Sequence, residues 1–364
     1  MDSSNDKKGM IKIVGISIAA IMVFAVIVWI YGKMTLENKN CKRMNGLYKD
    51  FPLIRTLNPS NTQFSHNLRD YYIKTAYNCC SAGSSFKNDY VNVCALKDCI
   101  RQGVRCLDFE IYSINNKPVI AVSSQDSFDV KESYNSVSFS SAMDIIRDYA
   151  FSGSTCPNPG DPLILHFRIM SNNKPIYNDM ANVLYNTLEN RLLGKKNSYE
   201  NNGKNLGLMS LKKLMGKVVI VVDKTNPLFQ DSELDEYVNI ASNSVFMRAL
   251  RYHDVRFTPD MQELIEFNKK HMTIALPDVS EKTTNISSSL AMKYGCHMVA
   301  MSFQNLDANM QYYDEMFDTA GSAFILKPDY LRYIPVKIPL PPPPNPAYSY
   351  KERPIKEDYY SFTI

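Results

Sequence analysis

The sequence predicts an α/β protein, a closed (β/α)8 TIM barrel preceded by a single transmembrane helix. Three observations support this prediction. An uncharged run of nineteen residues lies close to the N-terminus. From about residue 71 onward, short β-branched runs alternate with amphipathic stretches, which is the pattern of strands separated by helices. Hydrophobic residues make up 45% of the chain and charged residues 21%, so most of it can bury a core.

The overall composition excludes several classes of protein. The 364 residues include 41 basic and 37 acidic side chains without a long basic block, so nucleic-acid binding is not indicated. Eight cysteines are too few for a disulfide-built scaffold of this length, and they leave the cellular compartment open. Because there is no CxxC pair and there are only five histidines, a structural zinc site is not expected.

Residues 13–31 form the predicted transmembrane helix, behind a short N-terminal tail at 1–12. A helix rises about 1.5 Å per residue, so the run IVGISIAAIMVFAVIVWIY spans roughly 29 Å, the thickness of a bilayer's hydrocarbon core. A cleaved signal peptide is the alternative, but its apolar region is usually about 7–15 residues long and ends in a small-x-small site, which is absent here. Basic residues flank both ends of the run, so a single-pass membrane location is predicted without a choice of side.

Residues 34–64 are polar and predict an irregular stalk between the membrane and a barrel over 65–332. The eight predicted strands lie at 71–78, 104–114, 117–124, 162–170, 217–223, 271–277, 297–303 and 322–328. The predicted helices lie near 94–102, 140–152, 174–194, 258–270 and 309–319. An open, doubly wound sheet is the alternative, but no GxGxxG or GxxxxGKS motif follows any predicted strand.

The tail over 333–364 contains the run PVKIPLPPPPNPAY. Proline fixes φ and lacks an amide N–H, so this run predicts a polyproline II segment that cannot join a sheet. Leu340–Pro344 is similar to the short proline motifs read by EVH1-type domains, which makes a proline-reading protein a candidate partner. A stiff spacer is the alternative.

Three stretches of the first half, at 71–78, 103–110 and 142–151, together resemble the catalytic barrel of the phosphoinositide-specific phospholipases C. Tyr71–Asn78 (YYIKTAYN) is similar to the opening strand of that barrel, which ends Ser-Ser-His-Asn. Gly103–Glu110 (GVRCLDFE) resembles the second strand, and 142–151 (AMDIIRDYAF) resembles the family's Ala-Ile-Arg-Asp-Tyr-Ala-Phe segment.

The second half resembles the same family. Residues 295–304 (GCHMVAMSFQ) are similar to Gly-Cys-Gln-x-Val-Ala-Leu-Asn-Phe-Gln, and 324–332 (FILKPDYLR) to the closing Tyr-Val-Leu-Lys-Pro-x-x-Leu-Arg. The resemblance thus implies a phospholipase C-like barrel with an X-like half over about 65–224 and a Y-like half over about 234–332.

The resemblance also implies a reaction, the two-step cleavage of an inositol phospholipid. One family histidine helps the inositol 2-hydroxyl attack phosphorus, and another protonates the leaving alkoxide. Imidazole suits both roles because its pKa near 6.5 lets it exchange protons at neutral pH. In eukaryotic members a Ca²⁺ held by Asn, Glu, Asp and Glu activates the hydroxyl and neutralises phosphate charge.

Transferred position by position, the resemblance leaves no catalytic histidine intact. The first histidine falls on Tyr77, and the second, from a Tyr-His-Gly motif, falls on Val122. Tyrosine, with a pKa near 10, is a poor base at neutral pH, and valine cannot transfer a proton. The sequence therefore predicts that the barrel has lost its reaction.

The implied Ca²⁺ site survives only as a remnant. Asn78 keeps its place, while Asp108 and Glu110 stand at the Glu and Asp positions with their lengths exchanged. The fourth ligand becomes Arg168, whose guanidinium would repel Ca²⁺ and could pair with either carboxylate. No cofactor is therefore expected. Arg168 and Lys224 are instead the candidate residues for binding a phosphoinositide headgroup.

Two functions follow from these substitutions. The favoured one is a membrane-anchored, catalytically inactive barrel that acts as a binding or structural module. The rival is an active, metal-independent phosphodiesterase with a rearranged site, in which His166 replaces the lost acid or base beside Arg168, Asp108 and Glu110. Bacterial relatives that use an arginine in place of Ca²⁺ give this rival some basis, but they keep both histidines.

Two features bear on compartment and source. Asn285 begins an Asn-Ile-Ser sequon, and a glycan there would place the barrel in the lumen or outside the cell. Abundant Asn, Lys, Ile and Tyr are typical of AT-rich genomes, such as those of large DNA viruses or intracellular parasites.

Overall fold

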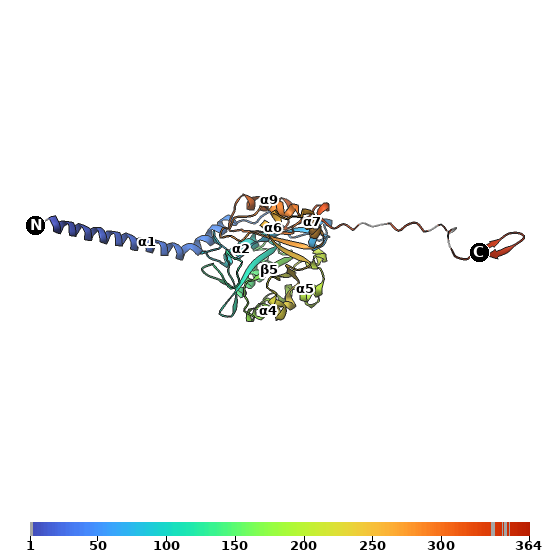
Figure 1. The fold of residues 1–364 in the computed structure, drawn as a ribbon, viewed down its shortest axis with the longest axis horizontal. Coiled ribbons are helices and arrows are strands. Elements are labelled where there is room, and N and C mark those ends of the chain that lie inside the picture. The colour runs from blue at the N-terminus through green and yellow to red at the C-terminus, as the bar shows by residue number, and fades with distance from the viewer. Residues whose placement is uncertain (1–2, 336–338, 344, 346–347, 349) are drawn as a thin grey trace. The chain divides into compact units, whose positions relative to one another are not determined.

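The computed structural model describes residues 3–335, 339–343, 345, 348 and 350–364. It separates into two units, Met1–Tyr333 and Ile334–Ile364. The first unit holds the N-terminal helix and the barrel, and the second holds the tail (Figure 1).

Parallel strands in the first unit form a nearly closed barrel, hydrogen-bonded in the order β7-β6-β5-β2-β1-β10-β9-β8. Their bounds are β1 (Tyr71–Ala76), β2 (Cys106–Ile114), β5 (Leu163–Ile169), β6 (Val218–Asp223), β7 (Ile240–Ser242), β8 (Met247–Arg251), β9 (Met272–Leu276) and β10 (Met298–Met301). No ladder joins β7 to β8 among the described residues, so the seam of the barrel lies between these two strands.

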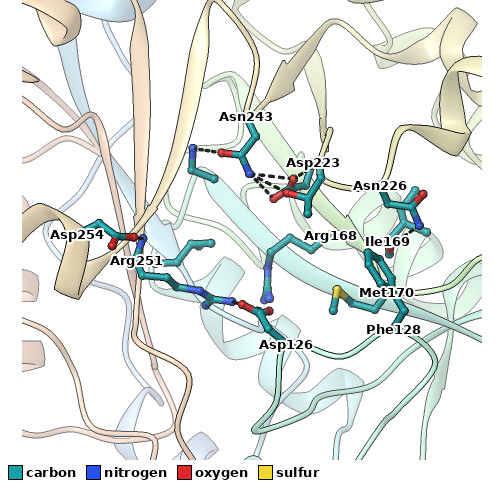
Figure 2. Close-up of a pocket in the computed structure, with 13 residues that line it drawn as sticks. Asp126, Phe128, Arg168, Ile169, Met170, Asp223, Asn226, Asn243, Arg251 and Asp254 are labelled. Atoms are coloured by element: carbon teal, nitrogen blue, oxygen red, sulfur yellow. Dashed lines mark hydrogen bonds and ion pairs between the residues drawn. The ribbon is translucent and has the colours of Figure 1, made fainter.

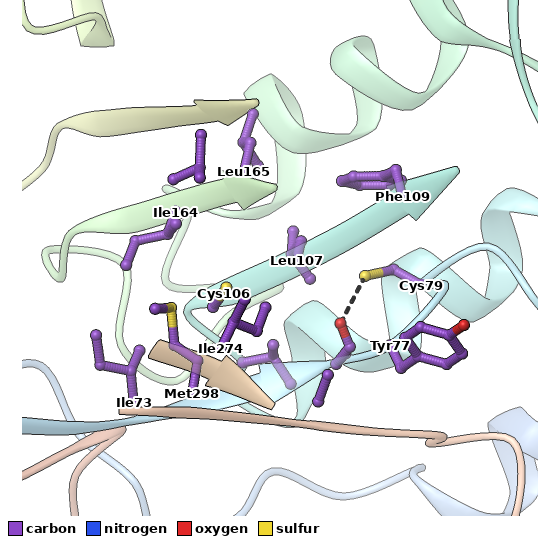
Figure 3. Packing of buried hydrophobic residues seen from close by; sticks show 14 of the residues in the cluster. Ile73, Tyr77, Cys79, Cys106, Leu107, Phe109, Ile164, Leu165, Ile274 and Met298 are labelled. Carbon is purple, nitrogen blue, oxygen red and sulfur yellow. Dashed lines mark hydrogen bonds between the residues drawn. The ribbon is translucent and has the colours of Figure 1, made fainter. Parts of the chain in front are cut away.

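Buried apolar side chains fill the inside of the barrel and the layer between strands and helices. Every residue of β1, β5 and β6 is buried, as expected for parallel strands covered by helices. Figure 3 shows Ile73, Leu107, Ile164 and Met298 packed together in this core.

Helices surround the barrel. They are α2 (Val93–Arg101), α3 (Phe139–Tyr149), α4 (Pro175–Leu188), α5 (Ser198–Gly203), α6 (Tyr252–Arg256), α7 (Met261–Lys270), α8 (Ser288–Lys293) and α9 (Ala308–Ala320). In α3, the Ser138 side chain accepts the Ser141 N–H as an N-cap, and Ala142 and Ile146 point into the core. The predicted helices correspond to α2, α3, α4, α7 and α9.

Two of the eight predicted barrel strands are wrong. The segment predicted at 117–124 forms β3 (Lys117–Ile120), which runs antiparallel to β2 and pairs with the short β4 (Val137–Ser138). The segment predicted at 322–328 forms β11 (Phe324–Leu326), antiparallel to β1. The barrel is completed instead by β7 and β8, which were not predicted because they are short, and β8 is mostly half-buried.

The predicted stalk is also wrong, because α1 runs without interruption over Ser3–Leu47 and its second half lies on the barrel. Met44 and Tyr48 are buried, four residues apart on one helix face, and Ile54 is buried beyond the helix. A disulfide joins Cys41 to Cys94 of α2, with 5.8 Å between their Cα atoms. The segment from Asn40 to Leu57 is therefore packed against the barrel and does not act as a spacer.

The first half of α1 has no protein around it. The segment Gly9–Leu47 contains a window with a mean hydropathy of 2.9, none of which is buried. This helix is long and apolar enough to cross a membrane.

The tail contains a hairpin that the proline content did not predict. Strands β12 (Pro354–Lys356) and β13 (Ser361–Thr363) pair antiparallel. Residues 339–343 have no regular structure, and Leu340 is 92% exposed. Pro344, the last residue of the proposed proline motif, lies outside the described residues.

Candidate functional site

Four polar side chains meet where β1, β2 and β5 end. Asp108 and Glu110 are two residues apart on β2 and so share its inner face, and Glu110 lies beside Arg168 in the ladder with β5. Asn78 follows β1 with a φ of 45°, a left-handed conformation that asparagine tolerates. Its N–H donates to Asp108 Oδ2 over 3.2 Å. The structure thus brings together the three residues of the predicted metal remnant and Arg168, which stands at the fourth ligand position.

Arg168 occupies the middle of this group. Its Nη1 donates to Glu110 Oε1 over 2.6 Å, and its Nε and Nη2 donate to the two oxygens of Asp108 over 3.0 and 2.8 Å. Nη2 also donates to Asn78 Oδ1 over 2.9 Å. All four side chains are buried. The guanidinium is therefore held by two carboxylates and an amide, a strong charge-assisted arrangement.

The contact between Arg168 and Asp108 determines the pKa values in this group of side chains. Burial acts to raise the pKa of Asp108, but the charge of Arg168 and the hydrogen bond from His166 hold it well below its usual range. Burial raises the pKa of Tyr77 above its ordinary value, with Arg168 opposing the shift. The phenolate form that could act as a base is thus even less populated at neutral pH than in an exposed tyrosine, and the Tyr77 ring lies 4.9 Å from the guanidinium carbon of Arg168.

Val122 lies next to the same group. It is buried, and the following N–H, from Ser123, donates to Glu110 Oε2 over 3.0 Å. The two positions that the resemblance assigns to histidine, Tyr77 and Val122, therefore both border the Arg168 cluster.

His166, the suggested replacement acid or base, lies inside the barrel. Its side chain is fully buried, with Nδ1 2.7 Å from Asp108 Oδ1 and Nε2 3.0 Å from Ser242 Oγ. Both ring nitrogens are bonded within the barrel, and His166 does not line the pocket at the mouth. A general acid or base must reach the proton that it transfers, so this position does not favour His166 in that role.

Lys224 lies apart from the Arg168 cluster. Its Nζ pairs with Glu200 Oε1 of α5 at 2.9 Å, and it is not among the residues that line the mouth pocket. Lys224 and Arg168 therefore have separate partners in the structure, and their joint binding of one ligand stays a prediction. The β5–β6 connection, which carries Glu200, supplied a partner that strand positions alone do not reveal.

A pocket of about 300 Å³ opens above Arg168 (Figure 2). Arg251, at the end of β8, reaches across it, and its Nη2 donates to both oxygens of Asp126, each over 2.7 Å. On the other side, Asn243 Nδ2 donates to both oxygens of Asp223. Sequence analysis missed Arg251, Asp126 and Asp223. A charged residue at the end of each strand was the signal available for Arg251 and Asp223.

The charges that line this pocket do not favour a polyanion. Three aspartates, Asp126, Asp223 and Asp254, face two arginines. Arg168 is already neutralised by two carboxylates, and Arg251 by Asp126. A multiply phosphorylated ligand would have to displace these partners.

Comparison with known protein families shows to which family the chain belongs. The sequence model described as phosphatidylinositol-specific phospholipase C, X domain, matches residues 64–224, and the corresponding Y domain matches 224–330. The chain belongs to the phosphatidylinositol-specific phospholipase C family.

Solved structures agree on the fold. PLC21 of L. pealei superposes with a TM-score of 0.62 at 18% identity, over 78% of this chain and 39% of that one. PLC21 of S. officinalis gives 0.62 at 17% identity, over 79% of this chain and 40% of that one. The chain thus spans about two fifths of the length of these relatives.

The Ca²⁺ that the family resemblance implies does not fit the residues present here. The guanidinium of Arg168 uses oxygens of Asp108, Glu110 and Asn78, the donors that a cation would need. No group of three or more His, Cys, Asp or Glu side chains that could hold a metal ion is found within the described part of the chain.

The sequon does not provide the expected indicator of compartment. Asn285 is buried, its Nδ2 donates to the carbonyls of Ser302 and Asn305, and its Oδ1 accepts the Ser302 N–H. A glycan on this nitrogen is incompatible with the folded barrel. The Cys41–Cys94 disulfide is the better indicator, because such bonds persist in oxidising compartments.

Proposed function

We propose that this protein is a membrane-anchored phospholipase C-like barrel that no longer hydrolyses phosphodiesters and acts as a binding or structural module. The observation that carries the proposal is the position of Arg168, which fills the remnant of the metal site and is bonded to Asp108, Glu110 and Asn78. Among the described residues that line the mouth pocket there is no histidine.

The anchoring part of the proposal rests on α1. Its apolar half is unburied and long enough to span a bilayer, whereas its second half is disulfide-bonded and packed against the barrel. Cleavage after the apolar run would leave that packed half in place, so the fold itself does not need the span. Resistance of the full chain to carbonate extraction from membranes tests the anchor.

The loss of catalysis is tested on the full chain in lipid vesicles. We expect no turnover of phosphatidylinositol or its bisphosphate, with or without Ca²⁺. Restoring the family residues together, by Tyr77→His, Val122→His and Arg168→Glu, tests whether only these positions block the reaction. Arg147→Glu, on the exposed face of α3, makes the same charge change away from the site and is the matched control.

The rival function would be recognised by a different result. Metal-independent turnover by the unmodified protein that is abolished by His166→Ala would support an active phosphodiesterase. Because His166 also holds Asp108, its replacement must be shown to leave the barrel folded, by circular dichroism.

Within the proposed binding function, a phosphoinositide headgroup remains the candidate ligand, and the pocket favours one with few phosphates. Carboxylates and amides such as Asp223 and Asn226 can bond the hydroxyls of an inositol ring, whereas the paired arginines offer little free positive charge. Titration calorimetry with inositol and with inositol trisphosphate discriminates these ligands. Tighter binding of the trisphosphate would contradict the preference.

The tail is proposed to bind a partner of its own, a proline-reading domain at Leu340–Pro344. The high exposure of Leu340 supports this, because docking needs an accessible side chain. A peptide covering 336–350 should bind a purified EVH1 domain, and Pro342→Ala with Pro343→Ala should abolish binding. Without binding, the tail is a spacer.

A further inference from the structure

An excess of positive charge is concentrated in the connection between β5 and β6. Residues 190–217 contain seven basic side chains and one acid, which gives this stretch a net charge of +6, whereas the whole chain has +4. The rest of the chain is therefore slightly negative. Such an uneven distribution of charge is typical of a surface that meets a charged partner.

This connection crosses the base of the barrel, where the parallel strands begin. Leu211 N–H donates to the His66 carbonyl, which places the connection beside the segment that enters β1. Asn205 Nδ2 donates to the carbonyl of Lys270, the last residue of α7, shortly before β9 begins. Lys217 directly precedes β6. The connection and the C-terminal end of α7 therefore share one face of the barrel, opposite the mouth.

Apolar side chains attach the connection to this face and leave lysines exposed. Leu211 and Leu214 are buried in the core, whereas Lys212 and Lys213, which lie between them, are exposed. Lys204 and Lys270 are exposed on either side of the hydrogen bond from Asn205. We call the four exposed lysines of this face the base patch: Lys204, Lys212, Lys213 and Lys270.

The base patch has no acidic partner within the described part of the chain. None of its four lysines forms a salt bridge there, whereas Lys195, earlier in the same connection, pairs with Glu236 at 3.9 Å. On α7 the acid Glu266 pairs with Lys269, at 2.7 Å, and not with Lys270. Four like charges are thus left without neutralisation on one face, where an extended anion would relieve their mutual repulsion.

The disulfide narrows the class of that anion. Cys41–Cys94 and the base patch belong to the same structural unit, and disulfides are rare in the cytosol and nucleus but persist at cell surfaces and in secretory compartments. This location disfavours nucleic acid, and acidic lipids are concentrated in the cytoplasmic leaflet. Sulfated polysaccharides are extended polyanions of the cell exterior, and lysine ammonium groups can bind their sulfates as point charges.

We infer that the base patch binds a sulfated polysaccharide of the heparin class, which makes the barrel an adhesive module at the end opposite its mouth pocket. The inference goes beyond the proposed role of the mouth pocket, and it holds whether or not the barrel is catalytic. Because the contact is between exposed charges, it weakens as salt screens them.

Binding of the full chain, held in phosphatidylcholine nanodiscs, to immobilised heparin tests the inference by surface plasmon resonance. Lys212→Gln with Lys213→Gln removes two charges from the base patch. Lys174→Gln with Lys282→Gln is the matched control, because these two lysines are also exposed but follow the carboxyl ends of β5 and β9 at the mouth. Circular dichroism confirms that both variants are folded.

We expect the base variant to bind heparin about tenfold or more weakly than the unmodified chain at about 0.1 M NaCl, and the control to differ by about twofold at most. Desulfated heparin should bind far more weakly than heparin. Absence of heparin binding by the unmodified chain, or equal losses in the two variants, would overturn the inference.

Two competitors identify the alternative anions. Phosphatidylserine vesicles and duplex DNA are each added to the chain bound to heparin, at matched concentrations of negative charge. We expect soluble heparin to release the chain at a lower charge concentration than either competitor. More effective release by the vesicles or by the DNA would assign the base patch to that anion and overturn the sulfated polysaccharide.

Discussion

Two buried arginine–aspartate clusters border β2 and behave differently, one at Arg105 just before the strand and one at Asp108 on its inner face. At the base, Arg105 donates to the main-chain carbonyls of Ala150 and Asn158, and Asp161 lies nearby. At the mouth, Arg168 donates only to side chains, including Asp108. The base arginine therefore satisfies main-chain carbonyls, whereas the mouth arginine neutralises two acids, each of which also accepts a backbone N–H.

The two aspartates show the same contrast in their protonation. Burial raises the pKa of Asp161 to about 6, since Arg105 and the hydrogen bonds from Leu57 and Asn158 only partly offset it. Burial acts in the same way on Asp108, but the direct pair with Arg168 outweighs it and lowers the pKa. Equal burial thus gives opposite shifts, and direct contact with a guanidinium decides the direction.

The largest change in stability is expected when the arginine of each cluster is removed. Arg168→Met leaves two buried carboxylates without a counterion and should lower the free energy of unfolding by about 3–5 kcal/mol. Adding Asp108→Asn and Glu110→Gln should recover most of that loss, because the site then carries no unpaired charge. Chemical unfolding of the full chain in detergent, followed by circular dichroism, measures both.

The Arg105 cluster at the base of the barrel provides the control for these variants. Arg105→Met should also destabilise, but adding Asp161→Asn should not restore stability, because the carbonyls of Ala150 and Asn158 stay unsatisfied at a cost of about 1–3 kcal/mol each. Recovery at the base equal to that at the mouth would show that the two arginines have the same role.

The pH dependence gives the next largest effect. Asp161 has a folded pKa of about 6, above the unfolded value of about 3.9. Between these values the folded state binds more protons, so stability contributed by neutral Asp161 is complete below about pH 4 and is lost as pH rises through 6. The change amounts to about 3 kcal/mol at most. Asp161→Asn should remove this slope, whereas Asp144→Asn, on the exposed face of α3, should not.

Most of the barrel could be predicted from sequence because its strands are buried apolar runs. The periodicity did not predict the direction of each strand or which strands close the barrel. The β3 run is as apolar as a barrel strand, yet the turn at Asn115 and Asn116, both with positive φ, folds it back onto β2. The three-residue β7 and five-residue β8 are too short to stand out, so the seam and Arg251 were both missed.

The site could be predicted only in part. The spacing of Asp108 and Glu110 places them on one strand face, so a pair with Arg168 follows from sequence. The burial of His166 against Ser242 and the pairing of Lys224 with Glu200 depend on segments far apart in the chain. The docked half of α1 did have a local signal, since Asn40, Met44 and Tyr48 recur at intervals of four residues.

A smaller effect is expected for calcium. The unmodified protein should bind Ca²⁺ no better than about millimolar, the weak end of natural sites, because Arg168 uses the remaining ligand oxygens. Arg168→Glu should raise the affinity by about tenfold or more, since it removes a positive charge and adds two oxygens. Titration calorimetry measures this, with Arg147→Glu as the control. Micromolar binding by the unmodified protein would contradict the assignment of Arg168.

The smallest effect concerns Lys224, and it tests whether the mouth ends at Arg251. The Lys224–Glu200 pair is partly exposed, with side-chain exposures of 32% and 21%, and such pairs contribute about 0–1 kcal/mol. Lys224→Met should therefore leave the unfolding midpoint almost unchanged and should not alter inositol binding, because Lys224 does not line the pocket. Arg251→Met, which does line it, should weaken that binding. If Lys224→Met weakened binding as much as Arg251→Met, Lys224 would have to leave Glu200 on ligand binding, and the mouth would extend to the β5–β6 connection.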